Sequence, residues 1–180
     1  MTKKYDIKVG DRFQNRKGSW YEVVKYNNCE DVMIKFDAGD YSFVQAINIR
    51  TGSVKSAYDK SVHGIGCVGE GVFSPTVNGK LTKLYNAWYN MMRRCYNADV
   101  QERQPTYKGC TVHPWWHNFQ HFAADAHYLD GFEDWYKNDI PHAWALDKDI
   151  ILPGNKEYGP NACKFVHIEE NSKHKGDWYE

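Results

Sequence analysis

Apolar and polar positions alternate in short runs over the first sixty residues. The runs RFQN, WYEVVKYN, VMIKFD and YSFVQAINIR are rich in Val, Ile, Tyr and Phe, and the segments RKGS, NCED and AGD separate them. Short alternating runs bounded by Gly, Asn and Asp are typical of antiparallel strands. The pattern therefore predicts a small β-barrel-like or β-meander module over residues 1–60.

Residues 61–80 lose this alternation, are rich in glycine and are predicted to be a connector. Gly64, Gly66 and Gly69 have the spacing of a dinucleotide-binding fingerprint, but no amphipathic helix follows directly, so nucleotide binding is not expected. The glycines indicate unusual backbone angles, or a close approach of the backbone to another surface, DNA included.

Helical periodicity begins at residue 81. Leu84, Trp88, Met91 and Cys95 recur at steps of four, three and four, so a helix with one apolar stripe is predicted over residues 81–96.

A second helix is predicted over residues 114–130, because Pro114 suits a first helical turn. Its expected apolar side consists of Trp115, Phe119, Phe122 and Ala126. Four-residue steps also join His113, His117, His121 and Asp125. This is metal-ligand spacing in principle, but a polar face that contains histidine is the commoner explanation.

Charge changes this picture locally. The chain has 23 basic and 23 acidic side chains, yet residues 76–112 hold six basic and two acidic groups, and residues 113–145 hold one and five. Such a distribution suits a protein that contacts phosphate with one element and holds a cation with another. The five cysteines form no CxxC pair, so neither a disulfide framework nor a cysteine-based zinc site is expected.

No apolar stretch approaches the ~20 residues of a membrane span, and the N-terminal segment MTKKYDIKVG has no apolar signal. We therefore expect a soluble, intracellular protein without a membrane partner.

Residues 145–175 predict a strand, a loop, a second strand and a helix. ALDKDII suits the first strand, LPGNKEYGPNA a structured loop, CKFV the returning strand and HIEENSKHK a polar helix. This order is that of a ββα-metal hairpin, in which a strand carboxylate and a polar helix residue face each other across a divalent cation. Such a cation can stabilise charge that develops on a phosphodiester. The predicted fold class is α+β.

Four segments carry a family resemblance when they are taken in order. They are LYNAWYNMMRRCYN, PTYKGCTVHPWWHNFQHFAADAHY, LDKDIILPGNKEYGPNACKFV and EEN. Together they resemble the HNH-type endonucleases and homing-endonuclease-like proteins of bacteriophages. The resemblance implies a DNA-binding module at 1–60 and an HNH-like region at 81–180. It also implies a monomeric phage-encoded protein that binds double-stranded DNA in the cytoplasm of the bacterial host.

The resemblance assigns roles by position. Asp147 matches the metal-binding aspartate of the first strand, and Asn171 matches the helix residue that completes the metal site. These oxygen ligands suit Mg²⁺ or Mn²⁺. The asparagine that ties the loop together falls near Asn161, where the order Gly-Pro-Asn-Ala-Cys departs from the family pattern, and Asn155 is the second candidate for this structural role.

Lys148 stands where the family has its general base, a histidine. A lysine with a pKa of ~10.4 stays protonated at neutral pH, so it can hold a phosphate or stabilise a transition state but cannot activate water. Asp149, His142, His167 and His174 are candidate substitutes for the base. His167 is preferred because it opens the helix close to the site.

DNA contacts are expected from the polar side of the helix predicted over residues 81–96. Arg93 and Arg94 suit phosphates, and Asn86 and Asn90 suit base edges, although a merely solvated face explains them equally well. Lys55 is a further DNA-binding candidate in the N-terminal module.

Three classes of function remain open. The first is a metal-dependent endonuclease that nicks or cuts double-stranded DNA. The second is a catalytically reduced nuclease scaffold that acts as a DNA-binding regulator or a phage-host interference factor, and Lys148 favours it. The third is a factor that binds a host or phage protein, which the overall neutrality and the acidic segment 113–145 keep open.

Overall fold

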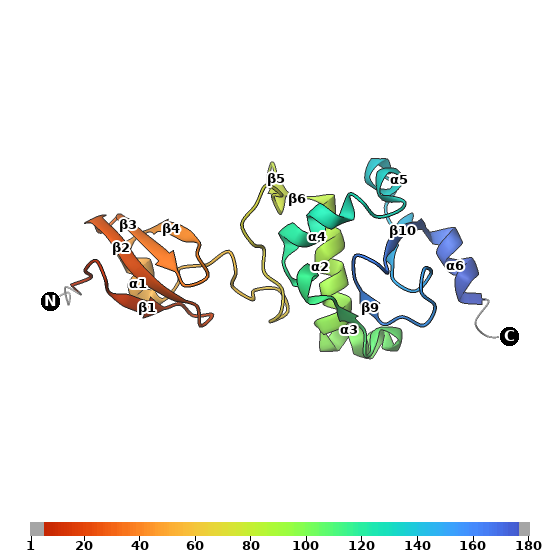
Figure 1. Cartoon of the computed structure of the whole chain (residues 1–180), viewed down its shortest axis with the longest axis horizontal. Helices are drawn as coiled ribbons and strands as arrows, with labels where there is room; N and C mark the ends of the chain where they lie inside the picture. Colours follow the sequence, from red (N-terminus) through yellow and green to blue (C-terminus); the bar gives the residue numbers. More distant parts are fainter. Residues whose placement is uncertain (1–5, 177–180) are drawn as a thin grey trace. The chain divides into compact units, whose positions relative to one another are not determined.

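The computed structural model describes residues 6–176, with the side chains of residues 6–172. The chain divides into two compact units, Met1–Ser61 and Val62–Glu180, and its architecture is mixed α+β (Figure 1). No helix within the described range is long and apolar enough to cross a membrane.

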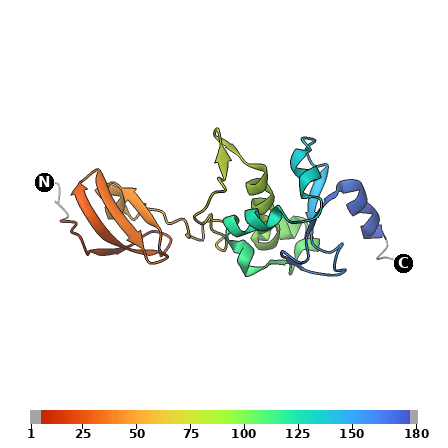
Figure 2. The same cartoon turned by 45° about the horizontal axis from the view of Figure 1, so that its top comes forward.

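The first unit is an antiparallel meander. Its elements are β1 (Arg12–Gln14), β2 (Trp20–Asn28), β3 (Asp31–Phe36), β4 (Tyr41–Val44) and α1 (Ala46–Thr51). The strands lie side by side in the order β1-β2-β3-β4 and do not close into a barrel, so the meander is the alternative that formed (Figure 2). Strand alternation buries Tyr21, Val23 and Ile34 on one face.

Helix α1 corrects the prediction that residues 41–50 form one strand. The strand ends at Val44, and Ala46 and Ile49 then turn into the core at a helical spacing of three. Gly52 ends the helix in the left-handed conformation that glycine adopts readily, with φ at 65°.

A buried polar network ties the segment after α1 to the sheet. Asp59 accepts hydrogen bonds from Asn15 Nδ2 and from the backbone N–H of Ser56, each at 3.0 Å. Asp40 accepts from Ser56 Oγ at 3.0 Å and from the N–H of Ala57 at 2.9 Å. Both carboxylates are therefore supplied with donors by the first unit itself.

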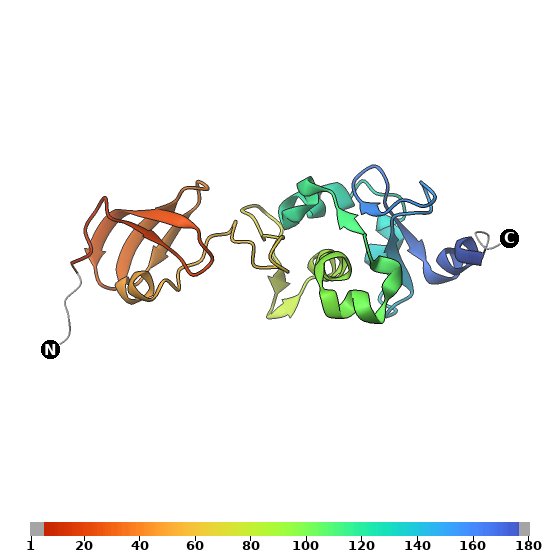
Figure 3. The same ribbon diagram turned by 90° about the horizontal axis from the view of Figure 1, so that it is seen from below.

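The second unit is built on helices and short strand pairs. Its first elements are β5 (Thr76–Val77), β6 (Lys80–Leu81), α2 (Lys83–Tyr96), α3 (Ala98–Arg103), η1 (Pro105–Tyr107) and β7 (Thr111–Val112). The later elements are η2 (Pro114–His117), α4 (Phe119–Ala126), α5 (Phe132–Lys137), β8 (Trp144–Asp147), β9 (Glu157–Tyr158), β10 (Lys164–His167) and α6 (Ile168–Gly176). Figure 3 shows α2 nearly end-on, with α3 next to it.

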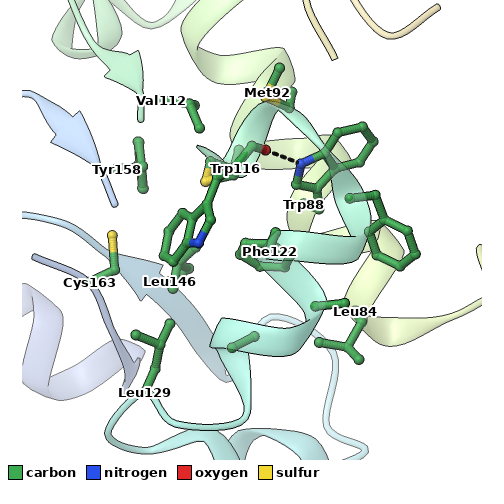
Figure 4. Packing of buried hydrophobic residues seen from close by; sticks show 14 of the residues in the cluster. Leu84, Trp88, Met92, Val112, Trp116, Phe122, Leu129, Leu146, Tyr158 and Cys163 are labelled. Atoms are coloured by element: carbon green, nitrogen blue, oxygen red, sulfur yellow. Dashed lines mark hydrogen bonds between the residues drawn. The ribbon is translucent and has the colours of Figure 1, made fainter. Parts of the chain in front are cut away.

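Helix α2 supplies one side of the core of this unit. All four residues of its predicted stripe are buried: Leu84, Trp88, Met91 and Cys95. Trp88 Nε1 donates to Trp116 O at 2.7 Å, which joins α2 to η2 inside the core (Figure 4).

The single helix predicted over residues 114–130 is wrong. The chain makes the short turn η2, breaks at Asn118 and starts again as α4, because the Asn118 side chain accepts from the N–H of Gln120 at 2.9 Å and caps the new helix. The break changes which tryptophan is inside. Trp116 is fully buried, whereas Trp115, the predicted core residue, is 50% exposed.

The glycine-rich segment 61–80 packs against the helices of the second unit. A Cβ on Gly66 would lie 2.9 Å from the Trp88 ring, and one on Gly69 would lie 2.2 Å from Asn118 Oδ1. Glycine is needed at both positions because any side chain would meet these groups. The close approach expected from the sequence is thus made to the protein's own side chains.

Strands β8 and β10 pair antiparallel, with Asp147 opposite Lys164 and Trp144 opposite His167. Helix α6 begins directly after β10 and packs against both strands. Helix α5 packs on β10, where the Trp135 and Phe165 rings stack at 4.1 Å. Strand β8 and helix α6 carry Asp147 and Asn171, the two residues that the sequence assigns to a metal site.

Candidate nucleic-acid interface and acidic strand end

A groove of about 820 Å³ lies in the second unit between the α2–α3 region and strands β8 and β10. Its basic and amide lining residues are Lys83, Asn86, Asn90, Arg93, Arg94, Arg103 and Gln104. Its other wall carries aromatic and apolar side chains, among them Trp135, Trp144 and Phe165. No carboxylate of the described residues lines it, so its field favours an anion.

Four of the five predicted DNA-binding residues come together in this groove, namely Asn86, Asn90, Arg93 and Arg94. The fifth, Lys55, is exposed in the first unit and is not a lining residue. Arg103 was missed in the sequence, although the basic excess of residues 76–112 pointed to its neighbourhood.

Arg94 is held between aromatic rings at the edge of this groove. Its Cζ lies 5.4 Å from the Tyr107 ring and 5.4 Å from the Tyr158 ring, and its Nε is buried without a hydrogen-bond partner. Burial alone would lower the pKa of Arg94, but the Tyr158 and Tyr107 hydroxyls outweigh it and the pKa is raised. The guanidinium therefore stays charged.

Lys148 is directed into the protein, with its side chain only 9% exposed. Its Nζ lies 3.0 Å from Asp149 Oδ2 and 5.8 Å from the Tyr158 ring. The ammonium is thus paired with a carboxylate and does not line the groove. Asp149, a predicted substitute base, is the group that neutralises it.

Asp147 ends strand β8 and turns the chain. Its Oδ1 accepts from the N–H of Asp149 at 2.8 Å and from the N–H of Ile150 at 2.9 Å. Burial raises the pKa of the Asp147 carboxyl and the neighbouring Asp149 carboxylate adds to the rise, whereas the two backbone donors oppose it. The neighbouring carboxylates of Asp147 and Asp149 provide oxygen ligands of the kind that Mg²⁺ or Mn²⁺ prefers.

Asn171 is the third polar group of this region. It is buried on α6, which packs against β8 and β10. Its amide oxygen is a possible ligand type for a hard cation. Within residues 6–172, no group of three or more His, Cys, Asp and Glu side chains is placed to hold a metal ion, so a bound cation would keep much of its water.

The preferred substitute base, His167, lies at the far end of the strand pair. It lies three positions after Lys164, the partner of Asp147, which corresponds to about 10 Å along the strand and to the opposite face. Its ring contacts Trp144 edge-on at 5.7 Å. His142 lines the groove, and the side chain of His174 lies outside the described residues.

Asn155 ties the loop between β8 and β10 together. Its Nδ2 donates to Lys148 O at 2.8 Å and to Glu157 O at 2.7 Å, and its Oδ1 accepts from the N–H of Glu157 at 3.1 Å. Asn161 is exposed and makes no such side-chain bond within the described chain. The structural role that the resemblance placed near Asn161 is performed by Asn155.

The histidine face around α4 is occupied by local contacts. His121 Nδ1 donates to Trp115 O at 3.0 Å and its ring stacks on that of Trp115 at 3.6 Å. Asp125 accepts from Trp116 Nε1 at 2.8 Å. These side chains make contacts with the tryptophans of the turn at η2.

Comparison with known proteins adds no relative to this description. No protein-family model, curated protein or solved structure matches the chain, so these residues alone carry the inference of function.

Proposed function

We propose that the chain is a double-stranded-DNA-binding protein of the HNH endonuclease type, and that the groove beside α2 receives the DNA backbone. The observation that carries the proposal is the composition of the groove: basic and amide side chains with no carboxylate among the described lining residues. Phosphate contacts dominate protein–DNA affinity, and a carboxylate-free basic surface is what they require.

Separate parts of the lining suit separate parts of DNA. Arg93 and Arg103 are exposed cations that can reach phosphates. Asn86 and Asn90 are exposed one helical turn apart on α2, and asparagine amides can pair with the edge of adenine.

Duplex binding measured at several salt concentrations tests the proposal. Arg93→Gln combined with Arg103→Gln should reduce the slope of log affinity against log salt by about 1.8, since each phosphate contact contributes about 0.9. Lys108→Gln is the matched control, because Lys108 is exposed nearby but does not line the groove. Equal slopes for all three proteins would reject the groove as the interface. Absence of duplex binding even at low salt would favour a protein partner instead.

Metal-dependent cleavage of the bound DNA is a second candidate function. The adjacent carboxylates of Asp147 and Asp149 and the buried amide of Asn171 support it, because they would hold Mg²⁺ or Mn²⁺. The cation would supply charge stabilisation at the phosphodiester. The chain's own contribution is to orient these ligands through the turn at Asp147 and through α6. Lys148 is paired with Asp149, so it supplies a positive charge beside these ligands and does not act as a base.

A plasmid assay with Mg²⁺ or Mn²⁺ separates cleavage from binding. A nuclease should nick supercoiled DNA, and Asp147→Ala should abolish nicking without changing duplex affinity. If the wild-type protein binds the plasmid but leaves it intact with both metals, the DNA-binding proposal stands without cleavage.

A further inference from the structure

We propose that Arg94 forms an internal phosphate-binding site at the edge of the groove, which takes a single phosphate of a DNA backbone. The inference deepens the proposed function and rests on it, since it names one anchoring contact among the groove residues.

Two cations share the Tyr158 ring, and only one of them has a counter-charge. Lys148 lies 3.0 Å from an Asp149 carboxylate oxygen. Arg94, at 5.4 Å from the same ring, makes no ion pair with a carboxylate among the described residues. A side-chain hydrogen bond joins it to the neutral Tyr107 hydroxyl. A partly buried charge without a counter-charge is costly, so the missing anion is expected to come from outside the chain.

Hydrogen bonding points the same way. Arginine has five N–H donors in a planar fork, and the buried Nε of Arg94 has no acceptor. A buried donor left unpaired costs about 1–3 kcal/mol, which makes an unpaired group in a folded protein a candidate for ligand contact. The flanking rings of Tyr107 and Tyr158 hold the guanidinium in place. A guanidinium ordered in this way suits bidentate binding of phosphate.

Helix α2 leads along the groove to this guanidinium. Asn86, Asn90 and Arg94 follow one another at steps of four residues, so they lie on one face of α2, and all three line the groove. Asn90 is therefore one helical turn from Arg94 and can offer its amide N–H to the same phosphate. Arg93 is exposed and supplies an outer contact.

Inorganic phosphate is the probe, because it tests the site without DNA. Thermal unfolding of the full chain is followed at rising phosphate, with sodium chloride adjusted to hold ionic strength constant. The wild-type midpoint should rise with phosphate as for a ligand that binds only the folded state. Arg94→Lys, which keeps the charge but loses the planar fork, should weaken phosphate binding about tenfold. Arg103→Lys, an exposed groove cation, should retain the response.

A second measurement avoids any folding defect of the Arg94 variant. The Nε–H resonance of Arg94 in the wild-type protein should shift on addition of phosphate, and Asn90→Ala should raise the phosphate concentration needed for that shift. No shift at any concentration, or an equal thermal response in Arg94→Lys, would overturn the internal site. Salt-dependent duplex binding with no phosphate response rejects this inference alone, whereas a phosphate response without duplex binding rejects the proposed function alone.

Discussion

The two units differ in how they surround their buried charged side chains. In the first unit, Asp59 and Asp40 are surrounded by neutral donors of the same unit, and their oxygens accept hydrogen bonds from them. In the second unit, Arg94 has a buried Nε without a partner, and Asp147 sits beside another carboxylate. Satisfied buried groups hold a fold together, whereas unsatisfied ones retain capacity for a ligand.

The contrast also separates residues within the second unit. Asn155 and Lys148 are satisfied by the loop and by Asp149, and therefore act as structure. Arg94 keeps a buried donor without a partner, and is therefore a candidate for contact with phosphate.

The largest effect is expected from Asp59→Ala. The change removes an acceptor from Asn15, Ser19 and Ser56 inside the first unit and should lower its free energy of unfolding by about 3 kcal/mol. Urea denaturation measures the loss, with Asp59→Asn as a milder control that keeps one acceptor oxygen. Duplex affinity of the folded protein should stay unchanged, and a specific loss of binding would show that this network does more than support the fold.

Asn155→Ala should have the next largest effect. It removes donors from Lys148 O and Glu157 O, so the free energy of unfolding should fall by about 2 kcal/mol. Asn161→Ala is the matched control at an exposed loop asparagine, and it should change stability by less than about 0.5 kcal/mol. If Asn161→Ala lowers the free energy of unfolding more than Asn155→Ala in urea denaturation, Asn161 and not Asn155 ties the loop together.

Asp147→Asn should stabilise the metal-free protein at neutral pH. Because burial raises the pKa of Asp147, the folded state holds its proton more tightly than the unfolded state. Wild-type stability should therefore fall as pH rises from the ordinary aspartate pKa through the raised one, and the cost persists above it. The Asp147→Asn variant should lack this loss of stability with rising pH, and its amide oxygen can still accept hydrogen bonds from the two backbone N–H groups. Melting temperatures recorded with EDTA across acid and neutral pH measure it, and a gain of equal size at every pH would contradict the assignment.

The smallest effect is expected at an exposed ion pair of the first unit. Arg12 Nη2 lies 2.6 Å from Asp37 Oδ2, but both side chains are more than half exposed. Arg12→Ala should therefore cost less than about 1 kcal/mol, and high salt should remove the difference. A loss as large as that of Asp59→Ala would show that exposed and buried polar contacts contribute equally to the stability of this unit.

Periodicity predicted much of the fold. The α2 stripe and the strand runs of the first unit were found because side chains repeat with the period of the element that buries them. The break at Asn118 was missed, since a cap and a proline-led turn can be joined into one apparent helical repeat when only spacing is considered. Residues 46–51 were missed because six residues are too few for a helical period to stand out from a strand.

By itself, the sequence determined the mixed α+β class, the helical stripe on α2 and the concentration of basic residues around it, because these depend on local order along the chain. Tertiary structure alone decided that Asn155 ties the loop and that Lys148 finds Asp149 while Arg94 finds no carboxylate. The physical reason is that hydrogen-bond and charge balance depend on how the chain folds back on itself. Arg94 and Lys148 meet at the Tyr158 ring, and Asp147 pairs across the strands with Lys164.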